Sequence, residues 1–223
     1  MDEKILKDLD AEGLRAVFLK YTRKAFESLP KIDSPRILDI GCGTGQPSLE
    51  LLKLSDGEIY GIDIDQDALD KLKLKIKQKG VSESLRVYND SIYNTQFDDE
   101  MFDIIWEEGV LHLLKIEKAL AECKRILKFN GFMVTGETAS WAGKSLKIFP
   151  KFGFKLIKEI KWEKDCWWTE YYAPLEKKIE ILKNKYGNIE KIEQIRRHLK
   201  EIEIVKKNPS KFDCTTYLMQ KIK

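Results

Sequence analysis

The sequence predicts an α/β fold in which a mostly parallel sheet of seven strands is covered by helices on both faces. Three observations predict it. Short apolar runs alternate with longer stretches of helical periodicity, several runs are followed at once by glycine or aspartate, and 223 residues suffice for one domain with a sizeable core. The charge is nearly balanced, with 40 Lys and Arg against 37 Asp and Glu, which is not typical of a dedicated nucleic-acid binder.

The elements follow in order along the chain. Residues 6–29 carry apolar side chains at helical spacing until Pro30, which predicts one or two N-terminal helices. The run RILDI at residues 36–40 predicts a strand that leads into a glycine-rich loop, and Pro47 suits the first turn of a helix that ends at residue 54. Further strands are expected at residues 58–64, 85–89, 102–106, 132–136, 155–162 and 214–222. Further helices are expected at residues 66–79, 115–127, 174–186 and 189–205.

No repeat or obvious linker divides the sequence, so we expect a single domain over residues 1–223. Within it we expect a helical cap at residues 1–30, a ligand-binding core at 31–162, a helical insertion or lid at 163–207 and a final strand at 208–223. The apolar runs are far shorter than the roughly 20 residues of a membrane helix. The N-terminus, MDEK, has no apolar signal core, which predicts a cytoplasmic protein that does not span a membrane.

The cysteine spacing argues against both a zinc knuckle and a disulfide framework. The four cysteines lie far apart and form no CxxC pair, so we expect reduced thiols and no metal site. These residues are Cys42, Cys123, Cys166 and Cys214.

A glycine-rich loop follows the first expected strand. In the run DIGCGTG at residues 39–45, glycines at alternate positions allow a sharp turn and a close approach of a ligand to the backbone. The loop lacks the Lys-Ser/Thr of a phosphate cradle, and its GxGxG spacing differs from the GxGxxG dinucleotide fingerprint. It is therefore read as a loop for a cofactor other than a dinucleotide, with a tight turn of incidental glycines as the alternative.

Carboxylates stand at the ends of three successive strands. Asp39 ends the first, Asp63 the second and Asp90 the third, and all would meet at the carboxyl edge of a parallel sheet, where open α/β folds bind ligands. A carboxylate at Asp63 could accept hydrogen bonds from both ribose hydroxyls, and Asp90 could accept from an exocyclic adenine amine. The order of these residues indicates a ligand of the adenosine type.

These motifs resemble, in order and spacing, those of class I S-adenosylmethionine-dependent methyltransferases. The resemblance covers residues 36–138 and is carried by the runs ILDIGCGTG at 37–45, GIDID at 61–65, NDS at 89–91 and FDIIW at 102–106. The runs GQP at 45–47, WEEG at 106–109 and WWTEYYAPLE at 167–176 look like a prokaryotic group of small, mostly uncharacterised methyltransferases. The fold that the resemblance implies is the Rossmann-like class I methyltransferase fold.

The resemblance also implies roles for individual residues. The glycine loop would hold the methionine end of S-adenosylmethionine near Asp39, and Asp63 would bind the ribose hydroxyls. The adenine would be surrounded by Ile64, Asp90, Ser91 and Ile92. The expected cofactor-binding set is Asp39, Gly41, Cys42, Gly43, Gly45, Gln46, Asp63, Ile64, Asp90, Ser91, Ile92 and Glu107. Cys42 lies inside the loop, which favours a loop-filling thiol over a nucleophile. The product of transfer would be S-adenosylhomocysteine.

Methyl transfer from a sulfonium requires a positioned nucleophile and, for some acceptors, a group that removes a proton. Glu107, Glu108 and His112 follow the fourth strand, so we expect them beside the reacting methyl group, with Glu108 and His112 as the candidate catalytic residues. The alternatives are ordinary loop carboxylates and a packed histidine held by one hydrogen bond.

Aromatic residues outside the nucleotide core are candidates for the acceptor site. Trp141, Trp168, Tyr171 and Tyr172 could contact the acceptor, the last three on a lid after the fifth strand. The alternative is that these rings pack a core. The Lys-rich stretch at residues 177–207 is typical of a solvated helix face, and RNA contact there is a weaker alternative.

The leading functional prediction is methyl transfer to a small-molecule acceptor. A methyltransferase of protein or RNA and a non-catalytic module that binds S-adenosylmethionine remain as alternatives. The residues after the fourth strand, EEGV, differ from the Asn/Asp-Pro-Pro-Tyr turn of adenine and glutamine amino-group methyltransferases.

Overall fold

The computed structural model describes residues 1–222, which form two compact units. The sheet unit comprises Leu19–Lys161 and the chain from Cys214 onward, and the helical unit comprises Met1–Phe18 and Trp162–Asp213. This division differs from the expected ranges, because the N-terminal region is split between the units. Phe18 packs its ring 4.4 Å from that of Trp167 in the helical unit, whereas Ala25 is buried in the core of the sheet unit.

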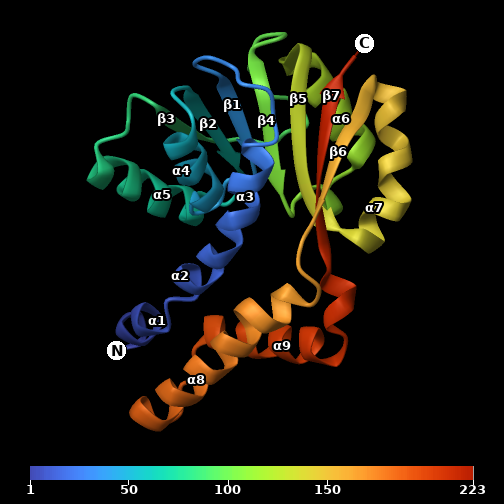
Figure 1. Cartoon of the computed structure of the whole chain (residues 1–223). Helices are drawn as coiled ribbons and strands as arrows, with labels where there is room; N and C mark the ends of the chain where they lie inside the picture. The colour runs from blue at the N-terminus through green and yellow to red at the C-terminus, as the bar shows by residue number, and fades with distance from the viewer. Residues whose placement is uncertain (223) are drawn as a thin grey trace. The chain divides into compact units, whose positions relative to one another are not determined.

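The sheet has seven strands in the order β3-β2-β1-β4-β5-β7-β6, as Figure 1 shows. The first five are parallel, whereas β7 runs antiparallel between β5 and β6. The strands are β1 Arg36–Ile40, β2 Glu58–Asp63, β3 Leu85–Asn89, β4 Phe102–Glu108, β5 Leu127–Thr138, β6 Phe154–Lys161 and β7 Cys214–Lys221. The expected mostly parallel sheet is confirmed, and β4 and β5 extend beyond the predicted bounds.

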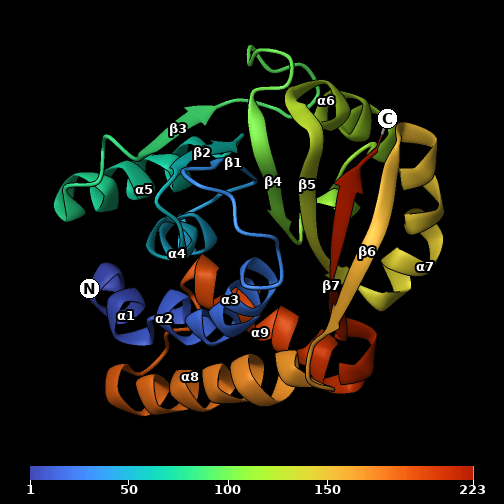
Figure 2. The same cartoon turned by 45° about the horizontal axis from the view of Figure 1, so that its top comes forward.

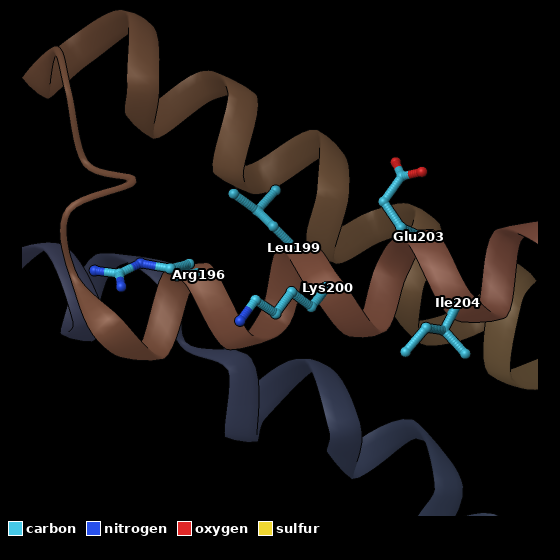
Figure 3. A pocket seen from close by; sticks show the side chains of 5 residues that line it. All are labelled: Arg196, Leu199, Lys200, Glu203 and Ile204. Atoms are coloured by element: carbon cyan, nitrogen blue, oxygen red, sulfur yellow. The ribbon is translucent and has the colours of Figure 1, made fainter.

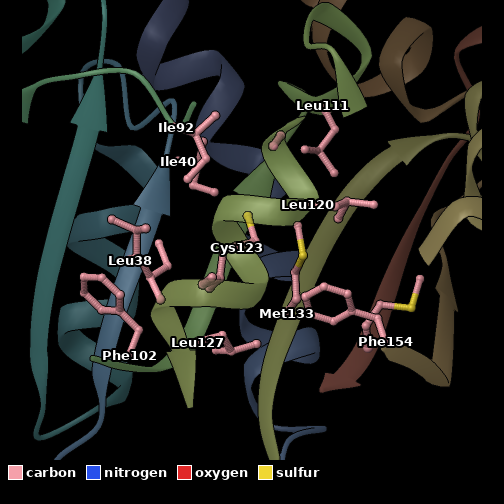
Figure 4. Close-up of a cluster of buried hydrophobic side chains, with 14 of the residues drawn as sticks. Leu38, Ile40, Ile92, Phe102, Leu111, Leu120, Cys123, Leu127, Met133 and Phe154 are labelled. Atoms are coloured by element: carbon pink, nitrogen blue, oxygen red, sulfur yellow. The ribbon is translucent and has the colours of Figure 1, made fainter. Parts of the chain in front are cut away.

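Helices cover both faces of this sheet, so that alternate residues of each strand face different cores. Ile37 of β1 packs in a core with α3 Leu19–Phe26, α4 Gln46–Leu54 and α5 Gln66–Lys79. Its neighbour Leu38 packs in the opposite core with α6 Ile116–Ile126 and α7 Ala139–Ser145. Figure 4 shows the second core, in which Leu120 and Cys123 of α6 lie over Leu38 and Met133 of the strands. Figure 2 shows α6 beside β4 and β5.

The N-terminal region is more broken than its periodicity predicted. Instead of one or two helices it forms α1 Asp2–Leu9, α2 Ala11–Arg15, the short η1 turn Ala16–Phe18 and α3. Asp10 is responsible for the first break, because its left-handed backbone (φ 47°) ends α1. Its carboxylate then accepts a hydrogen bond from the Gly13 backbone N–H at 3.1 Å and caps α2.

The helical unit also contains the π-helical turn η4 Trp167–Tyr172, α8 Ala173–Tyr186, α9 Glu193–Lys207 and the η5 turn Pro209–Phe212. Its core includes Ile5, Tyr171, Ile179 and Ile195. The predicted helix at 189–205 starts later, because Ile189–Ile192 closes a turn with a backbone hydrogen bond of 3.0 Å. The short segments α7 and η3 Leu146–Phe152 were not predicted. None of the helices described is long and apolar enough to cross a membrane.

An open hollow lies on one face of α9, lined by Arg196, Leu199, Lys200, Glu203 and Ile204 (Figure 3). These residues recur at helical spacing, and the buried Ile195 and Ile202 of the same helix are not among them. The hollow therefore belongs to a solvated helix surface of the helical unit, and none of the predicted site residues lines it.

Candidate active site

Hydrogen bonds hold the glycine loop between β1 and α4 against the end of β2. The backbone N–H groups of Gly41 and Cys42 both donate to the carbonyl of Ile62, at 2.8 and 3.1 Å. The N–H of Gly43 donates to Oδ2 of Asp63 at 2.7 Å. Gly43 has φ +51°, and a Cβ built there would meet only Asp63 Oδ2 within 4 Å, at 3.9 Å. The loop thus presents open backbone beside a carboxylate, which is the arrangement that the sequence predicted for a ligand site.

The ends of β2 and β3 lie next to each other. The backbone N–H of Asp90 donates to the carbonyl of Asp63 at 3.1 Å, and Oδ1 of Asp90 accepts from the N–H of Ser91 at 2.7 Å. Ile64 is 78% exposed, whereas Ile92 is buried in the sheet core. The structure therefore brings Asp63, Asp90, Ser91 and Ile64 to one edge, while core packing accounts for Ile92.

Asp39 is buried at the end of β1. Its Oδ2 accepts a hydrogen bond from the Ser48 hydroxyl at 2.5 Å. Burial, together with the charges of Glu108, Glu107 and Asp63, raises the pKa of Asp39 to about 8 against the lowering effect of Ser48. The carboxyl edge of the sheet thus gathers several carboxyl groups, and their environment keeps the buried Asp39 protonated up to about pH 8.

Cys42 is also buried, and its Sγ occupies the space beside Gly61, where an added Cβ would approach it to 2.8 Å. Burial raises the pKa of this thiol, so that it stays protonated. Gly45 caps α4 with φ +84°, and Gln46 is the first residue of that helix. These features agree with a loop-filling role for Cys42.

Glu107 and Glu108 end β4 and have different surroundings. Glu107 is fully buried: Oε1 accepts from the backbone N–H groups of Val110 and Leu111, the latter at 3.0 Å, and Oε2 accepts from the Thr135 hydroxyl. Its internal partners fix the turn after β4, and the cofactor contact of Glu107 stays a prediction. Burial and the charge of Glu137 raise the pKa of Glu107 to about 8.

Glu108 is partly buried and is held from two sides. Its Oε1 accepts hydrogen bonds from the Thr22 hydroxyl of α3 and from the Trp106 indole, each at 2.8 Å. Thr22 is itself buried, so α3 is the element that fixes this carboxylate.

His112 lies in the η2 turn Leu111–Leu113, directly beyond β4. Its Nδ1 lies 3.2 Å from both carboxylate oxygens of Glu137, and its backbone N–H donates to Glu137 Oε1 at 3.0 Å. The His112 side chain is 46% exposed, whereas that of Glu137 is 1% exposed. Sequence reasoning missed Glu137, although it directly follows the predicted fifth strand, as Asp90 follows the third.

The predicted acceptor residues are divided between the units. Trp141 belongs to α7 of the sheet unit, where its ring meets that of Phe149 edge-on at 6.5 Å. Tyr171 and Tyr172 belong to the helical unit and pack against each other at 4.7 Å, and Lys206 lies 5.5 Å from the Trp168 ring centroid in the same unit. Burial raises the pKa of Tyr172 and keeps its hydroxyl protonated. Packing within the helical unit explains Tyr171, and the lid role of this segment stays a prediction.

Comparisons with known proteins agree with the motifs. Residues 38–135 match the family model described as a methyltransferase domain. An uncharacterised protein of Haemophilus influenzae is 35% identical over 103 residues, which are 45% of this chain and 41% of that protein. The sterol 24-C-methyltransferase ERG6B of Gibberella zeae is 27% identical over 97 residues, 43% of this chain and 26% of that enzyme. The chain thus spans less than half the length of these curated relatives.

Solved structures show the same fold at low sequence identity. The [4+2]-cyclase SpnF superposes with a TM-score of 0.76 at 19% identity, covering 91% of this chain and 80% of that one. Phosphoethanolamine N-methyltransferase 2 of Haemonchus contortus was solved with S-adenosyl-L-methionine. It superposes with a TM-score of 0.69 at 14% identity, covering 96% of this chain and 57% of that one. The matched segment, the strand order and the glycine loop agree with a methyltransferase domain of the class I, S-adenosylmethionine-dependent type. Over part of its length the chain also resembles an uncharacterised prokaryotic protein.

Proposed function

We propose that this chain transfers the methyl group of S-adenosylmethionine to a small-molecule acceptor. The observation that carries the proposal is the gathering of carboxyl groups at one sheet edge, where burial and then repulsion by neighbours such as Glu108 and Asp63 oppose ionisation of Asp39. A ligand that carries a sulfonium and an ammonium group would relieve this repulsion. The cationic charge of S-adenosylmethionine therefore suits the electrostatics of the site.

The residues present fit this ligand. The open backbone at Gly43 would take the methionine end, together with Gly41, Gly45 and Gln46, because side-chain atoms approach Gly43 no closer than 3.9 Å at the Cβ position. Asp63 is the proposed partner of the ribose hydroxyls. The adenine would lie among Ile64, Asp90 and Ser91, with the buried Ile92 beneath them. Asp39 is the proposed counter-charge for the amino group.

When bound, S-adenosylmethionine supplies a methyl group on a sulfonium whose C–S electron pair leaves with sulfur, giving S-adenosylhomocysteine. The protein has to orient the acceptor and receive its proton where one is lost. Glu108 is suited to orientation, because Thr22 and Trp106 hold its carboxylate. His112 is suited to receive a proton, because its ring is half exposed beyond the end of β4.

Two features favour a small molecule over a protein or RNA acceptor. The large apolar side chains of Ile64 and Leu113 are 78% and 73% exposed after β2 and β4, and exposed apolar surface suits a compact ligand. The net charge of +3 provides no strong field for RNA. Sterol methyltransferase and phosphoethanolamine methyltransferase, both named for small acceptors, are among the proteins that this chain resembles.

The aromatic residues Trp141, Trp168 and Tyr172 are the proposed acceptor contacts. Trp168 is the most informative to change, because it is only partly buried, whereas Tyr171 packs in the helical unit. Trp168→Ala should leave S-adenosylmethionine affinity within about threefold while lowering transfer about tenfold, equivalent to about 1.4 kcal/mol. Lys206→Met is the matched control, since it removes the cation beside the ring and keeps the ring. Unchanged methyl transfer by the Trp168→Ala variant would show that the Trp168 ring packs the helical unit and does not contact the acceptor.

The function is tested in two stages. Calorimetry with S-adenosylmethionine should show saturable binding by the wild-type chain. Incubation of a metabolite extract with isotope-labelled S-adenosylmethionine should then move label into a small product. Binding without any labelled product would favour the non-catalytic module, and label in protein or RNA fractions would favour the macromolecular acceptor. A cytoplasmic location is part of the proposal, because all four cysteines are free thiols.

A further inference from the structure

His112, Glu137 and Glu107 form a connected set of titratable side chains at the carboxyl ends of β4 and β5. Glu137 Oε1 bridges the backbone N–H and the ring Nδ1 of His112, at 3.0 and 3.2 Å. Nδ1 is the ring nitrogen nearer to the backbone, so one carboxylate can reach it and the backbone N–H together, which Nε2 cannot do. The bridge therefore fixes the ring with Nδ1 toward Glu137 and Nε2 away from it.

The protonation states of the two buried carboxyl groups, Glu107 and Glu137, support this orientation. Burial raises the pKa of both Glu107 and Glu137, and the charge of Glu137 raises that of Glu107 further. Glu137 also accepts a hydrogen bond from the backbone N–H of His112 at 3.0 Å. We assign the single negative charge of the pair to Glu137, while Glu107 keeps its proton. An ionised Glu137 can only accept a hydrogen bond, so Nδ1 of a neutral His112 has to carry the hydrogen.

We propose that Glu137 holds His112 in the Nδ1-protonated tautomer, so that Nε2 is the atom that takes the proton of the methyl acceptor. This inference rests on the proposed function. As the acceptor atom bonds to the methyl carbon and the C–S pair returns to sulfur, the acceptor's proton passes to the Nε2 lone pair. The resulting imidazolium is stabilised by the carboxylate of Glu137 and loses its proton to water afterwards. Glu137 and Glu107 are positioning residues, since they act through His112.

The surroundings of His112 set this tautomer even without a bound methyl acceptor. No hydrogen bond of Nε2 is found within residues 1–222, so the described contacts of the imidazole all involve Nδ1. The side chain of Glu137 is 1% exposed, and water does not compete well for its oxygens. The tautomer can therefore be measured without any acceptor.

Long-range proton–nitrogen NMR of the ¹⁵N-labelled chain reports the tautomer. The sequence has only two histidines, so His198→Gln assigns the signals of His112. We expect the neutral imidazole of His112 to show a single tautomer, with the hydrogen on Nδ1. In Glu137→Gln the amide NH₂ can donate to Nδ1, so a mixture with the Nε2–H tautomer should appear. Glu107→Gln mimics the protonated acid and is the matched control, in which the Nδ1–H tautomer should persist.

The second measurement uses S-adenosylmethionine itself. His112→Gln should bind it within about threefold of the wild-type affinity by calorimetry and should transfer label to an extract at least tenfold more slowly. A wild-type Nε2–H tautomer, or normal transfer by the His112 variant, would overturn the inference while leaving the proposed function intact. Failure of the wild-type chain to bind S-adenosylmethionine would overturn the proposed function, and with it the reaction assigned to Nε2.

Discussion

The hydroxyl of Thr22 on α3 donates a hydrogen bond of 2.8 Å to Oε1 of Glu108 at the end of β4, although 86 residues separate them in the sequence. Trp106 donates to the same oxygen at the same distance. The N-terminal helix of the sheet unit therefore does more than cover the sheet. It fixes one carboxylate of the candidate active site from outside the methyltransferase motif.

Thr22→Val should lower the free energy of unfolding by about 1 kcal/mol, because a buried hydrogen bond to a carboxylate is lost while the volume is kept. Denaturant unfolding measures this change. Thr22→Ser is the matched control, since it retains the hydroxyl. A valine variant as stable as wild type, with the serine variant less stable, would contradict a contribution from the hydrogen bond and would indicate methyl packing instead.

Asp63→Asn should weaken S-adenosylmethionine binding by about 1.5 to 3 kcal/mol, equal to one to two decades in affinity. The amide oxygen can still accept from the Gly43 N–H, so the loop contact of 2.7 Å is kept while the charge that favours ribose hydroxyls is removed. Calorimetry measures the effect.

The control for this substitution is Asp67→Asn, an exposed aspartate in the first turn of α5. It removes the same charge from the same neighbourhood and should leave the affinity unchanged. Equal losses in both variants would point to a general electrostatic effect and against a specific contact of Asp63.

Local signals were sufficient to predict the nucleotide core. The strands β1 and β3 and the helix α5 have the predicted bounds, because short apolar runs, Asp65 as helix cap and Gly80 at the helix end are encoded within a few residues. Asp63 and the glycine loop were predicted for the same reason, since a turn and a strand end are properties of the adjacent sequence.

Contacts between distant segments could not be predicted in this way. The tie from Thr22 to Glu108 depends on where α3 packs, and the bridge from Glu137 to His112 depends on the register of β4 beside β5. The burial of Glu107 likewise follows from its partner Thr135 on the neighbouring strand, which no spacing within the sequence of β4 reveals.

The stability of the protein should fall as the pH rises between about 4 and about 8. The pKa of Asp39 is raised from its ordinary 3.8 to about 8, so within this window the native state holds a proton that the unfolded chain releases. Glu107, raised from 4.5 to about 8, acts in the same direction. Each group contributes a slope of up to about 1.4 kcal/mol per pH unit.

Asp39→Asn should therefore flatten the pH dependence of the unfolding free energy, measured in denaturant at pH 5, 6 and 7. The variant should gain stability relative to wild type at each step up in pH. Asp33→Asn, at an exposed aspartate that pairs with the exposed Lys31, should retain the wild-type slope. A wild-type slope in the Asp39 variant would show that Asp39 is ionised in the native state throughout this window.

Gly45→Ala should mainly lower the stability of the fold, whereas Gly43→Ala should mainly weaken ligand binding. Both residues have positive φ, +51° and +84°, so both substitutions carry the backbone cost of about 1 to 2 kcal/mol. A Cβ at Gly45 would also lie 2.2 Å from Cδ1 of the buried Leu72, whereas at Gly43 the nearest atom is Asp63 Oδ2 at 3.9 Å. Gly45→Ala should consequently unfold at a lower denaturant concentration than Gly43→Ala.

Gly43→Ala should fold but bind S-adenosylmethionine at least tenfold more weakly, because its methyl group occupies the proposed ligand space. Normal affinity in a folded Gly43→Ala chain would exclude a ligand at this glycine, and equal stability of the two variants would show that Leu72 moves aside at little cost.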